Sequence, residues 1–507
     1  MGLYDFSIYD LICRNAVSFR DRPAWFEVDD GRRLNFGGYK QKADGLARGL
    51  QKTGIRKGDR IGALGKNSLE YFLLYGAAAA LGALMVPVNW RLSAEEIAFN
   101  LNDCTPKLLF ADEEYQGLVS GIQNRLPSVQ SYFNLKADAG GFNGFESLMT
   151  SAGAFEAPEV ASDDGFVIIH TAAVTGRPRG ALLSHANILA AGFHMNHLFG
   201  MTPADVHLNL LPLFHVAGLT MAFQAFHAGA RSVNISKFDA RQTAELIDAE
   251  KVSVLYEFSP ILASILTAQV ETGRDIKSLR AVLGLDRPET IEQYQQATGG
   301  IFYCVYGQTE TSGLATLGKY NDRPGAAGKI LHLADVRLVD ENDHSLAPGE
   351  IGEITVKGPL VFKGYWNLAE DTARAFRGGR HHTGDLGRFD EDGFLWYEGR
   401  KADKELIKPG GENVYPAEVE RVILQHPAVA KTVVFGVPDP KWKEGIKAVC
   451  LLEKGQSLAA RELIRFVGER IASFKKPQYV EFVTDFPVLK DGTPDRAKIK
   501  AKFGGGA

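Results

Sequence analysis

One segment of this sequence has the composition of a phosphate-binding loop. Residues 170–180 read HTAAVTGRPRG and follow an apolar run, so the sequence predicts a strand over 166–170 that leads into a loop. Small residues let backbone N–H groups approach phosphate oxygens, and Arg179 could neutralise their charge. The segment matches neither the G-x-x-x-x-G-K-[ST] nor the G-x-G-x-x-G pattern. By itself it is also explained as a surface turn rich in small residues.

A second segment places an aromatic ring, a hydroxyl and a carboxylate within five residues. Residues 306–310 read YGQTE and follow the apolar run 301–305, which predicts a strand. Tyr306 could stack on a nucleotide base, Thr309 could contact a phosphate and Glu310 could bind Mg²⁺. The competing interpretation is a turn at the end of an edge strand.

A third segment pairs a carboxylate with a later arginine. Residues 382–385 read HTGD, and Arg400 lies in the following Gly-Arg-Lys. Asp385 could accept hydrogen bonds from both hydroxyls of a ribose, and Arg400 could donate to the same sugar. An aspartate after glycine is otherwise an ordinary turn residue.

The elements that must position these residues alternate along the chain. Strand patterns at 33–36, 60–65 and 108–111 and a helical spacing at 38–52 predict βα units and a mainly parallel sheet covered by helices. Residues 71–88 carry no charge, but charged amphipathic segments flank them. We predict a buried helix running into a core strand there, not a membrane span.

A domain boundary is predicted near residues 399–401. A charged stretch containing Pro409 and two glycines follows, as is typical of a linker or hinge. The remainder has an α+β pattern, with helices predicted over 416–424 and 459–471 and strands over 432–436 and 447–452.

Composition limits the function classes. With 507 residues the chain is long enough for two or more domains, and a net charge of −4 without a Lys/Arg block argues against a nucleic-acid partner. The four cysteines lie far apart without a CxxC pair, and no signal peptide is evident, which indicates a reducing compartment. We expect a cytoplasmic protein without an integral membrane span; loose membrane association and a homodimer are left open.

In their order along nearly the whole chain, these segments resemble the adenylate-forming superfamily of acyl-CoA synthetases, peptide-synthetase adenylation domains and beetle luciferases. Further segments that carry the resemblance are LPLFHVAG at 211–218, GY at 364–365, GGENVYP at 410–416, GVPD at 436–439 and FKKP at 474–477. The acyl-CoA synthetase type fits best. It implies that a carboxylate and ATP give an acyl-adenylate and pyrophosphate, after which coenzyme A takes the acyl group and AMP leaves, with Mg²⁺ as cofactor.

The resemblance also implies an α/β fold. It predicts a large N-terminal domain over 1–400, built of mainly parallel sheets with helices plus a β-barrel-like portion. A small, mobile α+β domain over 401–507 would swing about a hinge near 400–405. Asp403 is the first candidate for the hinge residue, with Lys404 or Glu405 as alternatives.

Residue roles follow from the same resemblance. Tyr306 should flank the adenine, Asp385 and Arg400 should hold the ribose, Thr309 should contact the α-phosphate and Glu310 should bind Mg²⁺. His215 should line the acyl site, against the alternative of a hydrogen-bonded core histidine. The other nucleotide-binding positions are Thr171, Thr175, Gly176, Gly180, Gly284, Asp286, Gly307 and Gln308, while Gly410 and Gly411 should line the pantetheine route.

Three departures from the family pattern bear on activity. The phosphate loop reads TAAVTGRPRG instead of TSGTTGxPKG, although Arg179 keeps its positive charge. The adenine-side segment reads Gly-Leu-Asp at 284–286 instead of Gly-Gly-Ala. Thr493 occupies the position of the adenylation lysine, so Lys490 or Lys498 could substitute, or Arg179 could carry more of the charge. The alternative to a working ligase is therefore a nucleotide- or acyl-binding protein with weak or lost adenylation.

The acid is not specified by the sequence. The expected pocket comprises residues 214–218, Phe258, 284–287 and those just before Tyr306, and it is largely apolar and aromatic. A fatty, aryl or alicyclic acid would suit it, and a luciferase-like oxygenase is a less favoured alternative.

Overall fold

The computed structural model describes residues 5–136, 141–149, 155, 157–171, 177–401, 405–409, 412–440, 443–489 and 493–504. Contacts divide the chain into two units. The large unit comprises Met1–Trp90, Leu101–Ile169 and Gly180–Gly399, and the small unit comprises Arg91–Asn100, His170–Arg179 and Arg400–Ala507. Among the described residues, no helix has both the length and the apolar character needed to cross a membrane.

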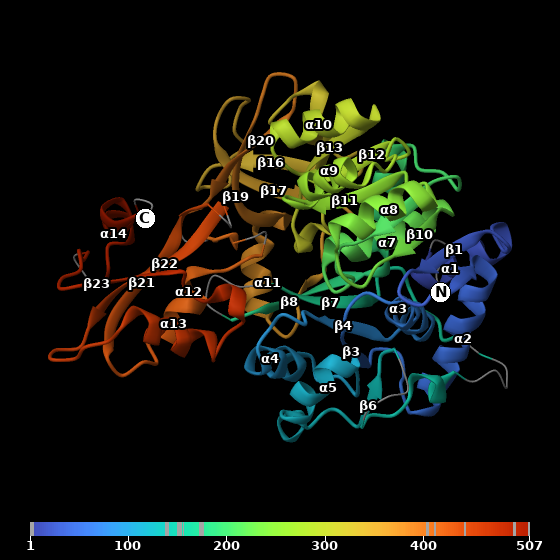
Figure 1. The fold of residues 1–507 in the computed structure, drawn as a ribbon, viewed down its shortest axis with the longest axis horizontal. Helices are drawn as coiled ribbons and strands as arrows, with labels where there is room; N and C mark the ends of the chain where they lie inside the picture. Colours follow the sequence, from blue (N-terminus) through green and yellow to red (C-terminus); the bar gives the residue numbers. More distant parts are fainter. Residues whose placement is uncertain are drawn as a thin grey trace. The chain divides into compact units, whose positions relative to one another are not determined.

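The largest sheet of the large unit has nine strands (Figure 1). Its order is β15 (Lys329–Ile330), β14 (Thr316–Lys319), β13 (Ile301–Tyr306), β12 (Ala281–Leu285), β11 (Val254–Phe258), β9 (Val206–Asn209), β10 (Arg231–Asn234), β1 (Pro23–Glu27) and β2 (Arg33–Asn35). The strands from β13 to β1 pair in parallel, whereas β14, β15 and β2 pair antiparallel at the edges. The helices packed along it are α7 (Val216–Ala228), α8 (Ala240–Glu250), α9 (Ile261–Thr272) and α10 (Pro288–Thr298).

A second mainly parallel sheet has seven strands. Its order is β18 (Gly364–Tyr365), β8 (Arg179–Ser184), β7 (Gly165–Thr171), β4 (Leu84–Val88), β3 (Arg60–Leu64), β5 (Leu108–Ala111) and β6 (Ser131–Asn134). The strands from β7 to β6 are parallel. The remaining helices of the N-terminal part are α1 (Ile8–Ser18), α2 (Phe36–Lys52), α3 (Leu69–Leu81), α4 (Ala94–Cys104), α5 (Glu113–Ser120) and α6 (His185–Phe199).

The uncharged segment at 71–88 is a buried helix that leads into a core strand, as predicted. Ser68 caps α3 by accepting the N–H of Tyr71, and Gly82 ends the helix in the left-handed region at φ 62°. Every residue of α3 is buried, and β4 follows directly. The aromatic ring of Phe72 stacks on Trp25 at 4.7 Å between centroids, which ties α3 to β1.

The portion expected to resemble a barrel is a four-stranded sheet whose first three strands in the order pair antiparallel. Its order is β16 (Asp335–Val339), β17 (Gly352–Lys357), β19 (His381–Phe389) and β20 (Leu395–Arg400), and the short helix α11 (Ala369–Ala375) precedes β19.

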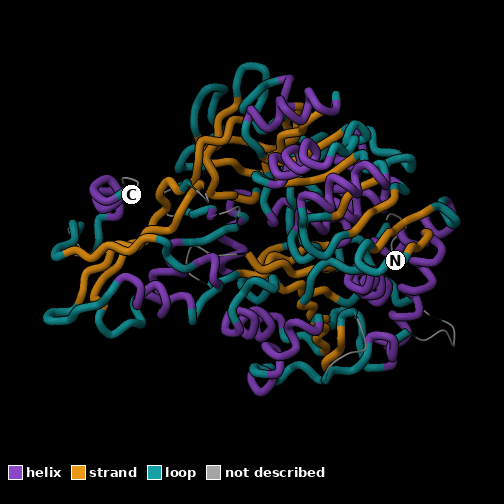
Figure 2. Tube along the Cα trace, in the orientation of Figure 1, coloured by secondary structure: helices purple, strands orange, loops and turns teal. Residues whose placement is uncertain are grey.

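The small unit has the predicted α+β character (Figure 2). Its sheet has the order β21 (Val429–Asp439), β22 (Lys443–Leu452) and β23 (Tyr479–Val483), accompanied by α12 (Pro416–Ile423), α13 (Ala460–Gly468) and α14 (Arg496–Phe503). Its buried core includes Val419, Val434, Ile446 and Leu463, drawn from helices and strands alike.

Candidate active site

The end of β13 and the middle of β19 meet in a buried hydrogen-bonded cluster. The hydroxyl of Tyr306 donates to Oδ2 of Asp385 at 2.8 Å, and Nε2 of Gln308 donates to the same oxygen at 2.5 Å. Gln308 Nε2 also donates to the carbonyl oxygen of Thr383 at 3.1 Å. Tyr306 and Asp385 are 7% and 2% exposed, so two of the predicted nucleotide-binding segments come together in a largely dry setting.

A histidine that sequence reasoning missed adjoins this cluster. Nε2 of His381 lies 3.3 Å from Oε1 of Gln308, and the ring packs edge-on against Phe362 at 5.2 Å. Because Gln308 is held by His381 on one side and by Thr383 on the other, its amide cannot turn freely. The carboxylate of Asp385 is therefore held by a donor that is itself fixed.

Glu310 is oriented by a tyrosine from a distant strand. The hydroxyl of Tyr365, in β18, donates to Oε1 of Glu310 at 2.9 Å, and the backbone N–H of Phe362 donates to the carbonyl oxygen of Glu310, also at 2.9 Å. Glu310 is 7% exposed. Thr309 and Glu310 begin a 3₁₀ turn over Thr309–Thr311, so their side chains leave a tight bend next to the Tyr306 cluster.

Glycine is required where the chain folds back after β13. A Cβ atom at Gly307 would lie 2.4 Å from the backbone of Gly313 and Leu314. The same holds at Gly284 in β12, where a Cβ would lie 2.2 Å from the carbonyl oxygen of Glu257. Asp286 follows β12 and is half-buried. These close approaches place backbone, not side chains, at the ends of two neighbouring parallel strands.

His215 begins α7. Its Nδ1 accepts the backbone N–H of Ala217 at 3.2 Å, which makes His215 the N-cap of the helix and requires the proton of the neutral ring to be on Nε2. The side chain is half-buried, so it is not a core histidine in the ordinary sense.

The ends of the predicted phosphate loop are visible on β7 and β8. Thr171 is the last residue of β7, and its hydroxyl donates to the carbonyl oxygen of Arg179, the first residue of β8, at 3.4 Å. Gly180 follows on β8, where a Cβ would lie 2.7 Å from Ile168. Two predicted loop residues, Thr175 and Gly176, fall outside the described residues.

The predicted residues of the small unit are described in part. Nη1 of Arg400 donates to the hydroxyl of Tyr415 at 2.9 Å. Nζ of Lys498 pairs with Oδ2 of Asp495 at 3.0 Å, and the lysine side chain is 72% exposed. Lys490, Gly410, Gly411 and the hinge candidates Asp403 and Lys404 fall outside the described residues.

A family model described as AMP-binding enzyme matches residues 13–366, and one described as AMP-binding enzyme C-terminal domain matches residues 418–492. Over 450 residues the chain is 33% identical to an indoleacetate–CoA ligase of Aromatoleum aromaticum, covering 87% of this chain and 88% of that one.

Solved structures agree with these matches. One, from Rhodopseudomonas palustris and assigned as a long-chain-fatty-acid CoA ligase, is 46% identical and covers 79% of this chain and 100% of its own, with a TM-score of 0.76. Another is the o-succinylbenzoate CoA synthetase of Bacillus subtilis with its acyl-adenylate intermediate. It is 28% identical, with a TM-score of 0.71 over 98% of this chain and 99% of that chain.

Proposed function

The chain belongs to the family of AMP-binding enzymes, and from this membership we propose how its residues join a carboxylic acid to coenzyme A. The protein is an ATP-dependent, AMP-forming acyl-CoA synthetase. It converts a carboxylate and ATP into an acyl-adenylate and pyrophosphate. It then transfers the acyl group to the thiol of coenzyme A with release of AMP.

The cluster of Tyr306, Gln308 and Asp385 carries the proposed nucleotide site. An ionised carboxylate is an acceptor only, with about four lone-pair positions on its two oxygens. Tyr306 and Gln308 both donate to Oδ2, so they fix the direction of the carboxylate of Asp385 while ribose hydroxyls add further donors. Tyr306 would flank the adenine, and Arg400 would add a donor to the ribose.

Glu310 is the proposed ligand of Mg²⁺, with Thr309 beside it on the α-phosphate. A single carboxylate suits this ion, which usually keeps waters and binds through one or two carboxylates together with substrate phosphates. When bound, the ion would neutralise charge on the phosphates as pyrophosphate leaves. The hydroxyl of Tyr365 donates to the carboxylate of Glu310 and would orient it toward the ion.

The remaining roles belong to the attack of the acid on ATP. His215 would line the acyl site near the reacting carboxylate. Thr171 and Arg179 would receive the phosphates from opposite ends of the phosphate loop, completed by Thr175, Gly176 and Gly180. The residues Gly284, Asp286 and Gly307 would contribute backbone to the nucleotide site. Lys490 or Lys498 would supply the cation that Thr493 lacks, and Gly410 and Gly411 would line the pantetheine route.

We propose that residues 1–400 bind AMP and the acyl group and that 401–507 move about a hinge near 400–405. An acid with an aromatic part is the favoured substrate class. The relatives named for indoleacetate and o-succinylbenzoate support this choice, and the one assigned to long-chain fatty acids supports a purely aliphatic acid instead. None of the four cysteines forms a disulfide among the described residues, and we propose a cytoplasmic location for the protein.

The nucleotide site is tested by replacing Asp385 with asparagine. The amide keeps the shape but turns an acceptor into a partial donor, which opposes the donors of Tyr306 and Gln308. We expect the Kd for ATP, measured by calorimetry, to rise at least about tenfold, as for loss of a hydrogen bond to a charged group. The exposed Glu341→Gln is the control. An unchanged Kd in a folded Asp385→Asn variant would contradict the assignment.

The substrate class is tested by a panel of aryl, fatty and alicyclic acids. Each acid is mixed with the enzyme, ATP, Mg²⁺ and coenzyme A, and AMP and pyrophosphate are measured. We expect aryl acids to give the fastest AMP release. ADP as the sole nucleotide product would be incompatible with the reaction described above.

A further inference from the structure

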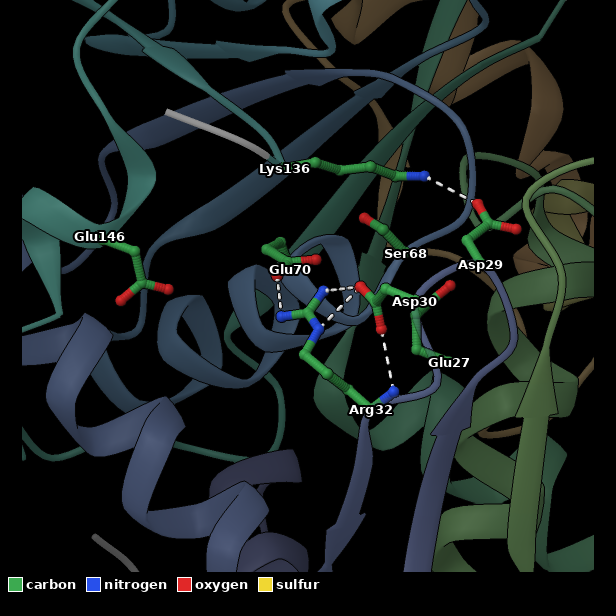
Figure 3. Close-up of a pocket in the computed structure, with 8 residues that line it drawn as sticks. All are labelled: Glu27, Asp29, Asp30, Arg32, Ser68, Glu70, Lys136 and Glu146. Atoms are coloured by element: carbon green, nitrogen blue, oxygen red, sulfur yellow. Dashed lines mark hydrogen bonds and ion pairs between the residues drawn. The ribbon is translucent and has the colours of Figure 1, made fainter. Parts of the chain in front are cut away.

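A polar cavity of about 270 Å³ lies in the large unit, and none of its lining residues belongs to the proposed ATP or acyl site (Figure 3). Its residues come from the end of β1, the turn before β2, the start of α3, the residue two after β6 and the turn over Phe145–Leu148. They are Glu27, Asp29, Asp30, Arg32, Ser68, Glu70, Lys136 and Glu146.

The cavity adjoins the carboxyl ends of parallel strands. In the seven-stranded sheet, β3 lies between β4 on one side and β5 and β6 on the other, so the direction of the connections reverses at β3. The carboxyl ends of β3 and β5 meet there, because the backbone N–H of Lys66 donates to Oδ2 of Asp112 at 2.7 Å. Ligands of open α/β sheets bind outside the carboxyl ends of strands at such a switch point. Ser68 and Glu70 follow β3, and Lys136 follows β6.

The floor of the cavity is buried and acidic. Glu27 and Glu70 are 1% and 3% exposed. The carboxylate of Glu27 accepts hydrogen bonds only from uncharged donors among the described residues: Trp25, Asn234 and the backbone N–H of Leu69. Burial accordingly raises the pKa of Glu27 to about 7. The rim is open, since the side chains of Asp29, Asp30, Arg32 and Lys136 are between 32% and 44% exposed.

One oxygen on this floor lacks a donor. Oε1 of Glu70 accepts from Nη1 of Arg32 at 2.5 Å, but Oε2 is buried and has no hydrogen-bond partner among the residues that the structure describes. In Figure 3 the carboxylate of Glu70 lies beside the guanidinium of Arg32, and a dashed line joins only one of its two oxygens to that group. A buried carboxylate oxygen without a donor is costly, and a ligand with N–H groups would satisfy it.

The charge balance determines the kind of ligand. Four carboxylates, together with Glu27, whose pKa burial raises to about 7, face two cations, Arg32 and Lys136. Within the described part of the chain, no three carboxylates of this cavity bring ligand atoms within 4.8 Å of one another, as a directly bound metal ion would need. Separated carboxylates match a ligand whose cationic N–H donors are themselves spaced along a chain.

We propose that this cavity binds a small organic polycation with primary ammonium groups, of the diamine or polyamine class. One ammonium group donates to Oε2 of Glu70 on the floor, and a second is received by the rim carboxylates Asp29 and Asp30. Arg32 competes with the ligand, since it already holds Oε1 of Glu70 and pairs with Asp30 at 2.7 Å. Removing Arg32 should therefore strengthen binding, whereas removing the charge of Glu70 should weaken it.

The probe is spermidine, titrated into the full-length protein by calorimetry at low ionic strength. In the wild-type protein we expect saturable binding at one site. Glu70→Gln, which keeps the shape of the side chain, should weaken it about tenfold or more. Glu114→Gln is the matched control, because this carboxylate, 48% exposed and paired with Lys66, makes the same change of charge outside the cavity. Arg32→Gln should tighten binding several-fold.

Two outcomes would overturn the proposal. If Glu70→Gln and Glu114→Gln weakened spermidine binding equally, the affinity would depend only on the overall charge of the protein and not on this cavity. Competition by Mg²⁺ or Ca²⁺ at concentrations below that of spermidine would mean a metal site instead. If the melting curve shows that Glu70→Gln does not fold, the test rests on Arg32→Gln. Weaker or unchanged spermidine binding in that variant would contradict the proposed competition between Arg32 and the ligand.

Discussion

At the scale of single residues, Glu310 illustrates how a hydrogen bond from another element orients a buried carboxylate. Its carboxylate is buried and receives the hydroxyl of Tyr365 from a strand 55 positions further along the chain. The orientation is therefore set by a side chain of the protein itself. A preorganised group has no reorganisation cost during the reaction, which is why such groups dominate catalysis in dry sites.

This arrangement predicts graded effects at two positions. Glu310→Ala removes the proposed ligand and should lower the rate of pyrophosphate release about 10²–10³-fold. Tyr365→Phe removes only one hydrogen bond, so it should lower the rate roughly two- to tenfold and raise the Mg²⁺ concentration needed for half-maximal rate. Both are measured as pyrophosphate release against Mg²⁺ concentration. If Tyr365→Phe left the Mg²⁺ dependence unchanged, the phenol would have a structural role only.

At the scale of elements, α7 depends on a glycine in its first turn. A Cβ at Gly218 would lie 2.3 Å from the carbonyl oxygen of Pro212, in the backbone just before the helix. The helix and the preceding turn therefore touch through their main chains. Since His215 caps the same helix, the position of this proposed acyl-site residue depends on that contact.

Gly218→Ala should consequently destabilise the protein by about 1–3 kcal/mol, the usual cost of overpacking, and slow acyl-adenylate formation as well. Gly117→Ala provides the control. Gly117 lies inside α5, where an added Cβ meets nothing within 4 Å, so the change should stabilise by up to about 1 kcal/mol. Urea unfolding midpoints compare the two variants. Equal urea midpoints for the two variants would show that the turn before α7 moves to accommodate the added Cβ at little cost in stability.

The elements also show what sequence patterns can and cannot predict. The helix α3 was predictable because its uncharged run is bounded by Ser68 and Gly82, a capping residue and a helix-ending glycine. The helix predicted over 38–52 begins two residues earlier, at Phe36, because Asn35 accepts the N–H of Gly38 and caps it. The strand predicted over 432–436 extends to Val429–Asp439, since its pairing with β22 continues through polar and proline positions that weaken a strand pattern.

Contacts between segments distant in sequence could not be predicted from any pattern. From the order of the motifs along the chain, Tyr306, Gln308 and Asp385 could be predicted as site residues. That Tyr306 and Gln308 both donate to Oδ2 of Asp385 could not be predicted. The roles of Tyr365 and His381 depend on hydrogen bonds across 55 and 73 positions, which have no periodicity in the sequence. The Gly-Tyr pair at 364–365 was a sequence signal for Tyr365. No sequence signal marked His381. Strand order is likewise set by packing and not by local spacing.

At the scale of the whole molecule, several buried ionisable groups link stability to pH. Burial lowers the pKa of His207 to about 3 and of His185 and His227 to about 4. It raises the pKa of Glu27 to about 7 and of Asp112 to about 6. The unfolded chain binds protons at the histidines below about pH 6.5, where the folded protein does not, so these residues destabilise the fold as the pH falls. The two acids act in the opposite direction, because the folded protein holds their protons to higher pH.

His207 offers a test of this linkage. It is 1% exposed, and its Nδ1 lies 3.3 Å from Oγ of Ser232. In wild type it should reduce the free energy of unfolding by at most about 1.4 kcal/mol per pH unit as the pH falls from 6.5 toward 3. His207→Gln should remove that share of the slope, measured by urea unfolding at pH 7 and 5. The control is His344→Gln, which makes the same substitution at a side chain that is 78% exposed. An equal slope in all three proteins would mean that His207 is protonated in the fold.

The division of the chain into two units leads to a prediction about the two half-reactions. The resemblance to adenylate-forming enzymes implies a lysine of the small domain that serves adenylation, and Thr493 stands at the corresponding position of this sequence. Lys498 is available as a substitute, because its side chain is 72% exposed and its ion pair with Asp495 lies at the same helix end, where it contributes little. A cation brought to a dry site is worth several kcal/mol. Lys490, the second candidate, lies next to the same segment in the sequence.

We therefore expect Lys490→Ala or Lys498→Ala to slow single-turnover formation of acyl-adenylate at least as much as Thr493→Ala does. Each should leave thioester formation from supplied acyl-adenylate near the wild-type rate, because the cation is needed only while pyrophosphate leaves. Thr493→Lys should likewise change the first half-reaction more than the second. Lys500→Ala is the matched control, since it removes a neighbouring lysine that pairs with Glu405. Full adenylation rates in both lysine variants would mean that Arg179, in the phosphate loop, supplies the charge; Arg179→Ala should then abolish the first half-reaction and spare the second.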